Sequence, residues 1–100
     1  MSFKNYFAMA LLSLCSVVAM AQNKSISGRV TDTNGEPVIG AGVTHVGTTN
    51  GVVTDYDGKF VFSVPDGATI NVEALGYDPQ QFTVVAGQNV YNVTLGESSM

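Results

Sequence analysis

The stretch that decides the fold is TDYDGKFVFSV, residues 54–64. Its second half alternates apolar and polar side chains with a period of two, which is typical of a β-strand with one buried face. Phe60, Phe62 and Val64 share that face, and burying each large apolar side chain contributes about 1.5–3 kcal/mol. We therefore expect the core to centre on this strand.

The first half of the same stretch predicts a turn. Asp57 and Gly58 form a dipeptide that favours tight hairpins, because glycine readily adopts a positive φ angle. Residues 51–54 form a short strand before it. The sequence therefore predicts a hairpin that joins strands 51–54 and 59–64.

The rest of the chain continues this pattern. After Lys24 no segment keeps apolar residues at helical spacing, and turn residues separate the remaining runs. The remaining predicted strands are 25–31, 41–46, 69–74, 82–85 and 90–95. The residues expected on the inward face of these strands are Ile26, Gly28, Val30, Ile70, Val72, Ala74, Tyr91, Val93 and Leu95. Seven short strands predict an all-β, seven-stranded antiparallel β-sandwich, because one open sheet would leave an apolar face in water.

The amino terminus carries the features of an export signal. Lys4 is followed by an uncharged, mostly apolar stretch at residues 7–20. Ala19 and Ala21 are the small residues that signal peptidase requires at the third and first positions before its cut. We expect residues 1–21 to be a cleavable signal peptide.

Two alternatives for this segment fit less well. A membrane-spanning helix needs about 20 apolar residues, whereas this stretch is shorter and contains Ser13, Cys15 and Ser16. Cys15 could mark a lipoprotein signal, but Leu14 stands where such a signal has a small residue. We therefore expect cleavage after Ala21 rather than lipidation.

The predicted mature chain divides into a β-sandwich at residues 22–96 and the start of a linker at 97–100. It contains no cysteine, so no disulfide can stabilise this small exported domain. It carries three positive and eight negative side chains, a net charge of −5. Nucleic acid and anionic lipid are therefore not expected as partners.

One set of turn and strand residues, in a specific order and spacing, extends along almost the whole mature chain. These are residues 28–30, 32–38, 40–43, Gly47, Thr48, Gly51, 54–60, Val64, Pro65, Gly76 and Tyr77. In this order and spacing they resemble the carboxypeptidase regulatory-like domains, a family of small transthyretin-like β-sandwiches. The resemblance implies the same sandwich fold that the alternation predicts.

An export signal directly followed by such a domain is similar to the amino-terminal extension of SusC/RagA-type TonB-dependent outer-membrane transporters of Bacteroidetes. The resemblance implies a non-catalytic accessory domain of a nutrient transporter, with a glycan as the expected cargo. It implies a place on the periplasmic side of the outer membrane, without membrane insertion of the domain itself. The implied partners are the plug and barrel of the transporter, together with periplasmic or envelope proteins.

Met100 falls inside the expected linker, so we expect the chain to be the leading piece of a transporter or a truncated product. A transmembrane barrel needs many long strands, so the mature chain is not expected to transport by itself. The alternative is a free-standing secreted module that binds glycan or protein through its loops or an edge strand.

Few residues suggest chemistry. The mature chain has no nucleophile motif, and its one histidine, His45, is expected at the rim of the sandwich, so neither a catalytic site nor a cofactor is predicted. Asp55 and Asp57 resemble the first ligands of a calcium loop, but the remaining oxygen donors are missing, which favours a hairpin turn. Tyr56 and Tyr77 could form a contact surface that stacks on sugar rings, or could cap the core.

Overall fold

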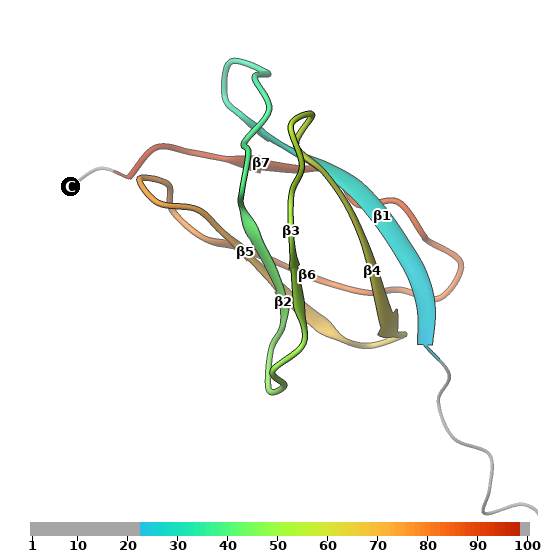
Figure 1. The fold of residues 1–100 in the computed structure, drawn as a ribbon. Coiled ribbons are helices and arrows are strands. Elements are labelled where there is room, and N and C mark those ends of the chain that lie inside the picture. Colours follow the sequence, from blue (N-terminus) through green and yellow to red (C-terminus); the bar gives the residue numbers. More distant parts are fainter. Residues whose placement is uncertain (1–22, 99–100) are drawn as a thin grey trace, which may run out of the picture.

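The computed structural model describes residues 23–98, which form seven strands and no helix (Figure 1). The strands are β1 (Asn23–Asp32), β2 (Gly42–His45), β3 (Gly51–Val53), β4 (Lys59–Pro65), β5 (Thr69–Glu73), β6 (Gln80–Thr83) and β7 (Val93–Leu95). The prediction of seven strands in an all-β fold is confirmed, and each predicted strand has its counterpart. The predicted signal peptide lies outside the described residues. Nothing within residues 23–98 forms a helix that could cross a membrane.

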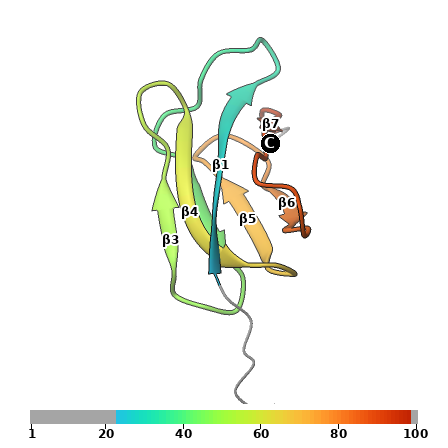
Figure 2. The ribbon, with the colours of Figure 1, turned by 90° about the vertical axis from the view of Figure 1, so that its right-hand side faces the viewer.

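The strands divide between two facing sheets (Figure 2). One sheet has the order β4-β1-β7 and the other the order β3-β2-β5-β6. Four of the five ladders are antiparallel as expected, but β7 runs parallel to β1, with Val30 opposite Val93 and Asp32 opposite Leu95. A parallel pair needs a crossover connection. The connection between β1 and β7 is the chain of residues 33–92, and its last part, residues 84–92, returns from β6 in the four-stranded sheet to the free edge of β1.

The turn between β3 and β4 forms, but it does not make a hairpin within one sheet. The N–H of Gly58 donates to the carbonyl oxygen of Asp55 (2.9 Å), and the N–H of Asp55 donates to the carbonyl oxygen of Lys59 (3.0 Å). Beyond this turn β3 pairs with β2, whereas β4 pairs with β1 in the other sheet. The predicted hairpin is therefore wrong in its sheet assignment. Crossing between the layers turns the apolar face of β4 toward the four-stranded sheet, where it can be buried.

The core lies between the two sheets and draws on both. Its buried side chains are Ile26, Val30, Val38, Ala41, Val43, Phe60, Phe62, Val64, Ala68, Ile70, Val72, Val84, Tyr91 and Leu95. Those predicted to face inward are buried or packed against this cluster, apart from Gly28, which has no side chain. The strand at 59–65 alternates strictly between exposed and buried positions up to Val64. Phe60, Phe62 and Val64 are thus buried in the core, on the face that the sequence predicts.

Gly28 lets the carboxyl-terminal segment approach β1 closely. A Cβ atom at this position would stand 1.8 Å from the carbonyl oxygen of Tyr91, which is far inside contact distance. On either side of this contact, Ser27 N–H donates to Asn89 O (2.8 Å) and Tyr91 N–H donates to Ser27 O (2.8 Å). The side-chain oxygen of Asn92 then accepts from Arg29 N–H (3.1 Å). The glycine therefore allows residues 89–92 to lie against the middle of β1.

Thr54 is the buried polar side chain of the described residues, and it ties the chain before β2 to the end of β3. Its hydroxyl donates to the carbonyl oxygen of Val38 (2.6 Å) and accepts from the N–H of Ala41 (2.9 Å). Both partners are backbone groups of buried residues. The hydroxyl thus satisfies two groups that water cannot reach.

Substituting Thr54→Val should destabilise the domain, because it removes the hydroxyl at nearly constant volume and leaves two buried backbone groups without a partner. The expected loss in the free energy of unfolding is about 1–3 kcal/mol, measured by urea titration of residues 22–100. Thr54→Ser is the matched control, since it keeps the hydroxyl and should lose less. Equal stability of the valine variant and the native chain would contradict this role.

Candidate functional site

The loop between β3 and β4 is organised by the carboxylate of Asp55. Its Oδ1 atom accepts from the backbone N–H of Asp57 (2.9 Å) and of Lys59 (2.9 Å). These two bonds lower the pKa of the Asp55 carboxyl, with the bond from Lys59 N–H as the largest cause. The carboxylate therefore accepts hydrogen bonds from the backbone of its own loop, although it is exposed to solvent.

The loop after β1 repeats this construction. Oδ1 of Asp32 accepts from the N–H of Asn34 (2.8 Å) and of Glu36 (3.0 Å). The carbonyl oxygen of Asp32 accepts from Gly35 N–H (3.1 Å), and the backbone N–H of Asp32 donates to Glu36 O (2.8 Å). Both loops thus place an aspartate first and a glycine fourth, with the same four hydrogen bonds.

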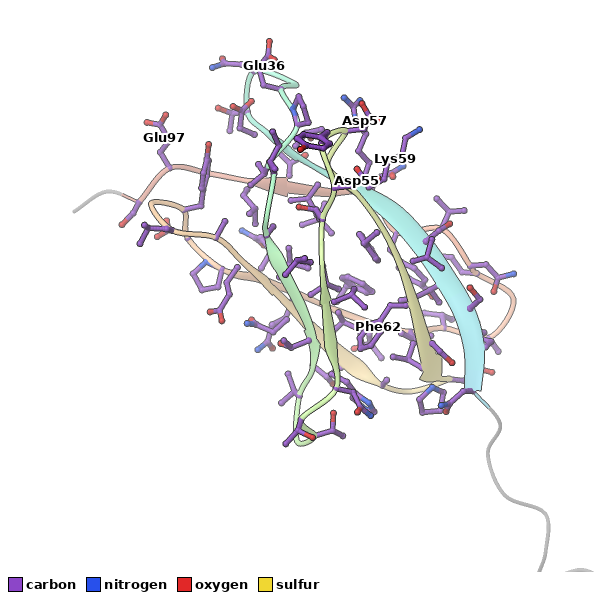
Figure 3. The ribbon with its side chains drawn as sticks, viewed as in Figure 1. Glu36, Asp55, Asp57, Lys59, Phe62 and Glu97 are labelled. Carbon is purple, nitrogen blue, oxygen red and sulfur yellow. The ribbon has the colours of Figure 1, made fainter. Side chains whose placement is uncertain are left out.

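The two aspartate loops pack against each other at one end of the sandwich. Gly58 has a φ angle of 73°, and a Cβ atom there would stand 2.5 Å from Val30 O and 3.1 Å from Pro37 Cβ. Gly58 O also accepts from Val30 N–H (2.7 Å). Figure 3 shows Asp55 and Asp57 at this end together with Glu36, while Phe62 lies between the sheets.

The structure places the two candidate calcium ligands in different roles. Asp55 directs its carboxylate at backbone amides, and Asp57 lies exposed on the other side of the turn tip. Within residues 23–98, no three side chains of His, Cys, Asp or Glu gather closely enough to hold a metal ion. The loop geometry is therefore explained by hydrogen bonds that the protein itself supplies.

The two candidate contact tyrosines are in different loops and differ in exposure. Tyr56, at the tip of the Asp55 loop, is 86% exposed. Tyr77 is partly buried against the core. The one close aromatic pair in the described part of the chain joins Phe82 and Tyr91, so Tyr56 and Tyr77 do not stack on each other.

Tyr77 lines a second surface feature. A hollow of about 420 Å³ lies over Gly40 and Gly42, and Leu75, Tyr77 and Pro79 contribute to its walls. Leu75 is fully exposed at its rim. Glu73 and Ala74 complete its lining, so the hollow presents an acid beside apolar side chains.

The loop that carries Tyr77 is held by the end of the described chain. Tyr77 and Glu97 form an isolated antiparallel bridge. Asp78 N–H donates to Gly96 O (2.9 Å), and Ser98 N–H donates to Gly76 O (2.9 Å). Backbone bonds therefore continue past β7 and fix the direction in which the chain leaves the sandwich.

Tyr91 has a structural role that the alternation did not reveal. Its ring stacks on Phe82 with centroids 4.6 Å apart. Its hydroxyl accepts from Val85 N–H (2.8 Å) and donates to Gln88 O (2.9 Å). An inward-facing tyrosine needs such partners for its hydroxyl, so this network could have been anticipated, although not its partners.

His45 lies at the end of β2, opposite Ile70, and is partly buried. Its backbone holds the next turn, since His45 O accepts from the N–H and the hydroxyl of Thr48 (3.1 and 2.8 Å). This is the rim position that the sequence predicts for it.

Asp55 should contribute to stability in a pH-dependent way. Because its pKa is lowered in the folded state, the stabilisation is present at neutral pH and is lost as the pH falls through the folded-state pKa. Asp55→Asn should therefore lower the urea midpoint at neutral pH. The gap to the native chain should close as the pH falls below the ordinary carboxyl value of 3.8.

Asp57→Asn is the matched control for this measurement, because it removes a charge of the same loop whose carboxylate makes no hydrogen bond in the described residues. If Asp57→Asn reproduced the full pH dependence of Asp55→Asn, net charge rather than the loop bonds would be responsible.

Comparison with known proteins assigns the domain. The model of the CarboxypepD_reg-like domain family matches residues 26–100. TonB-dependent receptor SusC of Bacteroides thetaiotaomicron is 49% identical over 75 residues, which is 75% of this chain and 8% of that receptor. A TonB-dependent receptor of Formosa agariphila is 29% identical over 91 residues, 90% of this chain and 9% of that receptor. The chain thus spans under a tenth of the length of these relatives.

A solved structure shares the fold. A chain of a type II cohesin–X-dockerin complex from Acetivibrio cellulolyticus superposes with a TM-score of 0.60 at 19% identity, covering 77% of this chain and 60% of that chain. Its similarity concerns the fold alone. The match of the family model over three quarters of the sequence identifies the domain: the chain belongs to the CarboxypepD_reg-like domain family.

Proposed function

We propose that this domain is a non-catalytic accessory domain at the amino terminus of a TonB-dependent outer-membrane transporter, located on the periplasmic side. The observation that carries the proposal is the 49% identity with a segment that makes up 8% of TonB-dependent receptor SusC. Most of such a receptor lies outside the matched segment, so the plug and barrel would be supplied by the rest of the transporter. The resemblance to SusC/RagA-type transporters leads us to propose a glycan as the cargo.

The proposed role of the domain is to make protein contacts. Two features support it: the exposed ring of Tyr56 and the hollow bounded by Leu75 and Tyr77. Both are held on loops whose backbones are fixed by hydrogen bonds, by Asp55 in one case and by residues 96–98 in the other. Binding to a surface that is already rigid costs less conformational entropy than binding to a mobile loop.

Residues 1–21 serve, in this proposal, as a signal peptide cleaved after Ala21. Mass spectrometry of the protein purified from the cell envelope should then find Gln22 as the first residue. A lipid-modified peptide beginning at Cys15 would contradict the proposed cleavage and indicate a lipoprotein instead.

The accessory role can be tested in the cells that express the domain. An antibody against residues 22–100 should label an outer-membrane polypeptide of receptor size. Deleting residues 22–96 in frame should leave the amount of that polypeptide unchanged and reduce growth on the transported glycan, because the missing contacts act on uptake and not on barrel assembly.

Tyr56→Ala separates contact from folding. Because the ring is exposed, its loss should leave the urea midpoint of the domain unchanged, whereas growth on the transported glycan should fall. A small secreted product as the sole labelled species would contradict the transporter role and favour a free-standing binding module.

A further inference from the structure

The outer side of the three-stranded sheet carries a hollow that combines apolar surface with several hydrogen-bond donors. It measures about 360 Å³ and lies over β1 and β4. Its polar side chains are Ser27, Arg29, Lys59 and Asn92, and Val61 contributes an apolar wall. No aspartate or glutamate is among its lining residues, although the mature chain has eight of them. We call these five residues the Arg29–Lys59 face.

The two cations of this face stand directly opposite each other. Arg29 and Lys59 are cross-strand partners in the β1–β4 ladder, and like charges in this position destabilise an antiparallel pair. Within residues 23–98 the one ion pair joins Lys24 to Asp66, so neither cation of the face has a carboxylate within 4 Å. The Asp55 carboxylate is near enough for the charge of Lys59 to help lower its pKa, but it does not pair with Lys59. An anion that binds between them would relieve their repulsion.

Neighbouring groups prepare the face for such an anion. Arg29 Nε donates to the carbonyl oxygen of Asp57 (2.9 Å), which holds one edge of the guanidinium in place. The terminal nitrogens of Arg29 remain for a ligand, and an arginine fork matches a carboxylate. The side-chain oxygen of Asn92 already accepts from Arg29 N–H, so the NH₂ group of Asn92 can donate a hydrogen bond to the anion.

The edge of β4 beside this face can hold a polypeptide backbone. β4 pairs only with β1 in the described structure. Gly58 O bonds toward β1, whereas Lys59 O bonds away from it. Alternation along the strand therefore directs the N–H and C=O groups of Val61 and Ser63 to the unpaired edge. Val61 is 65% exposed on the same strand.

We propose that the Arg29–Lys59 face binds an extended, acidic segment of a partner protein. The backbone of the segment pairs with the free edge of β4, and carboxylates at every second position reach Lys59 and Arg29. Charge favours such a partner, because two of the three cations in residues 23–98 lie on this face of an otherwise acidic domain. The face adjoins the loop that carries Tyr56, because Arg29 Nε and Lys59 N–H both bond to that loop. The proposal does not depend on the transporter setting.

The test is an NMR titration of residues 22–100, which contain the entire core, with a short peptide that alternates Glu and Thr. Amide shifts should be confined to residues 27–29 and 59–63 and should weaken at high salt. The Gln–Thr counterpart of the peptide should bind at least about tenfold more weakly. Arg29→Gln and Lys59→Gln should each cause a loss of similar size.

Lys24→Gln is the matched control, because it removes one positive charge that is already paired with Asp66 at the other end of β1. It should change the affinity less than about twofold. Equal losses in all three variants, or no shifts at millimolar peptide, would overturn the proposal. Inorganic phosphate or an oligouronate that binds as tightly as the peptide would also overturn it, because the backbone edge would then contribute nothing.

Discussion

The sandwich depends on β1 being paired along both of its edges. β4 occupies one edge over residues 23–29, and the segment from Asn89 to Leu95 occupies the other. The second pairing is possible only because Gly28 lets the backbone of Tyr91 come within contact distance. Since β7 is the last strand and β1 the first, this contact joins the two ends of the domain. It also makes β1 the central strand of its sheet, and the inward-facing side chains of this strand, Ile26 and Val30, are completely buried.

The same strand positions the two aspartate loops. One loop follows directly from the end of β1, and the other leads into β4, its antiparallel neighbour, so both emerge at the same end of the sheet. Each carboxylate satisfies two amides that the turn would otherwise leave to solvent. Asx turns of this kind explain why aspartate and glycine recur at the same spacing. The negative charges of Asp32 and Asp55 thus follow from backbone geometry and need no bound metal to explain them.

Alternation along the sequence predicted most of the fold, because it reports directly which side chains a strand buries. It located all seven strands and the core strand at Phe60, Phe62 and Val64. It could not predict which strands share a sheet, since the Asp57-Gly58 turn is compatible with both a hairpin and a crossing. It could not predict that β7 runs parallel to β1 either, because sheet order depends on contacts between distant residues. The side chains outside the core differ in the same way. The rim position of His45 could be predicted from the local alternation. The hydrogen bonds of the Tyr91 hydroxyl could not, because they depend on residues 85–88, which no periodicity identifies.

The distribution of charge follows from these same constraints. Asp32 and Asp55 hold turns, and Asp66 pairs with Lys24 where β1 begins, so these acids are used by the fold itself. Arg29 and Lys59 differ from these acids in forming no ion pair within residues 23–98, although Arg29 Nε bonds to Asp57 O. Folding stability alone would favour one acid in such a cross-strand pair. The repulsion between these two cations would fall if an anion bound beside them, which links the charge pattern of the sheet to the binding proposed for the edge of β4.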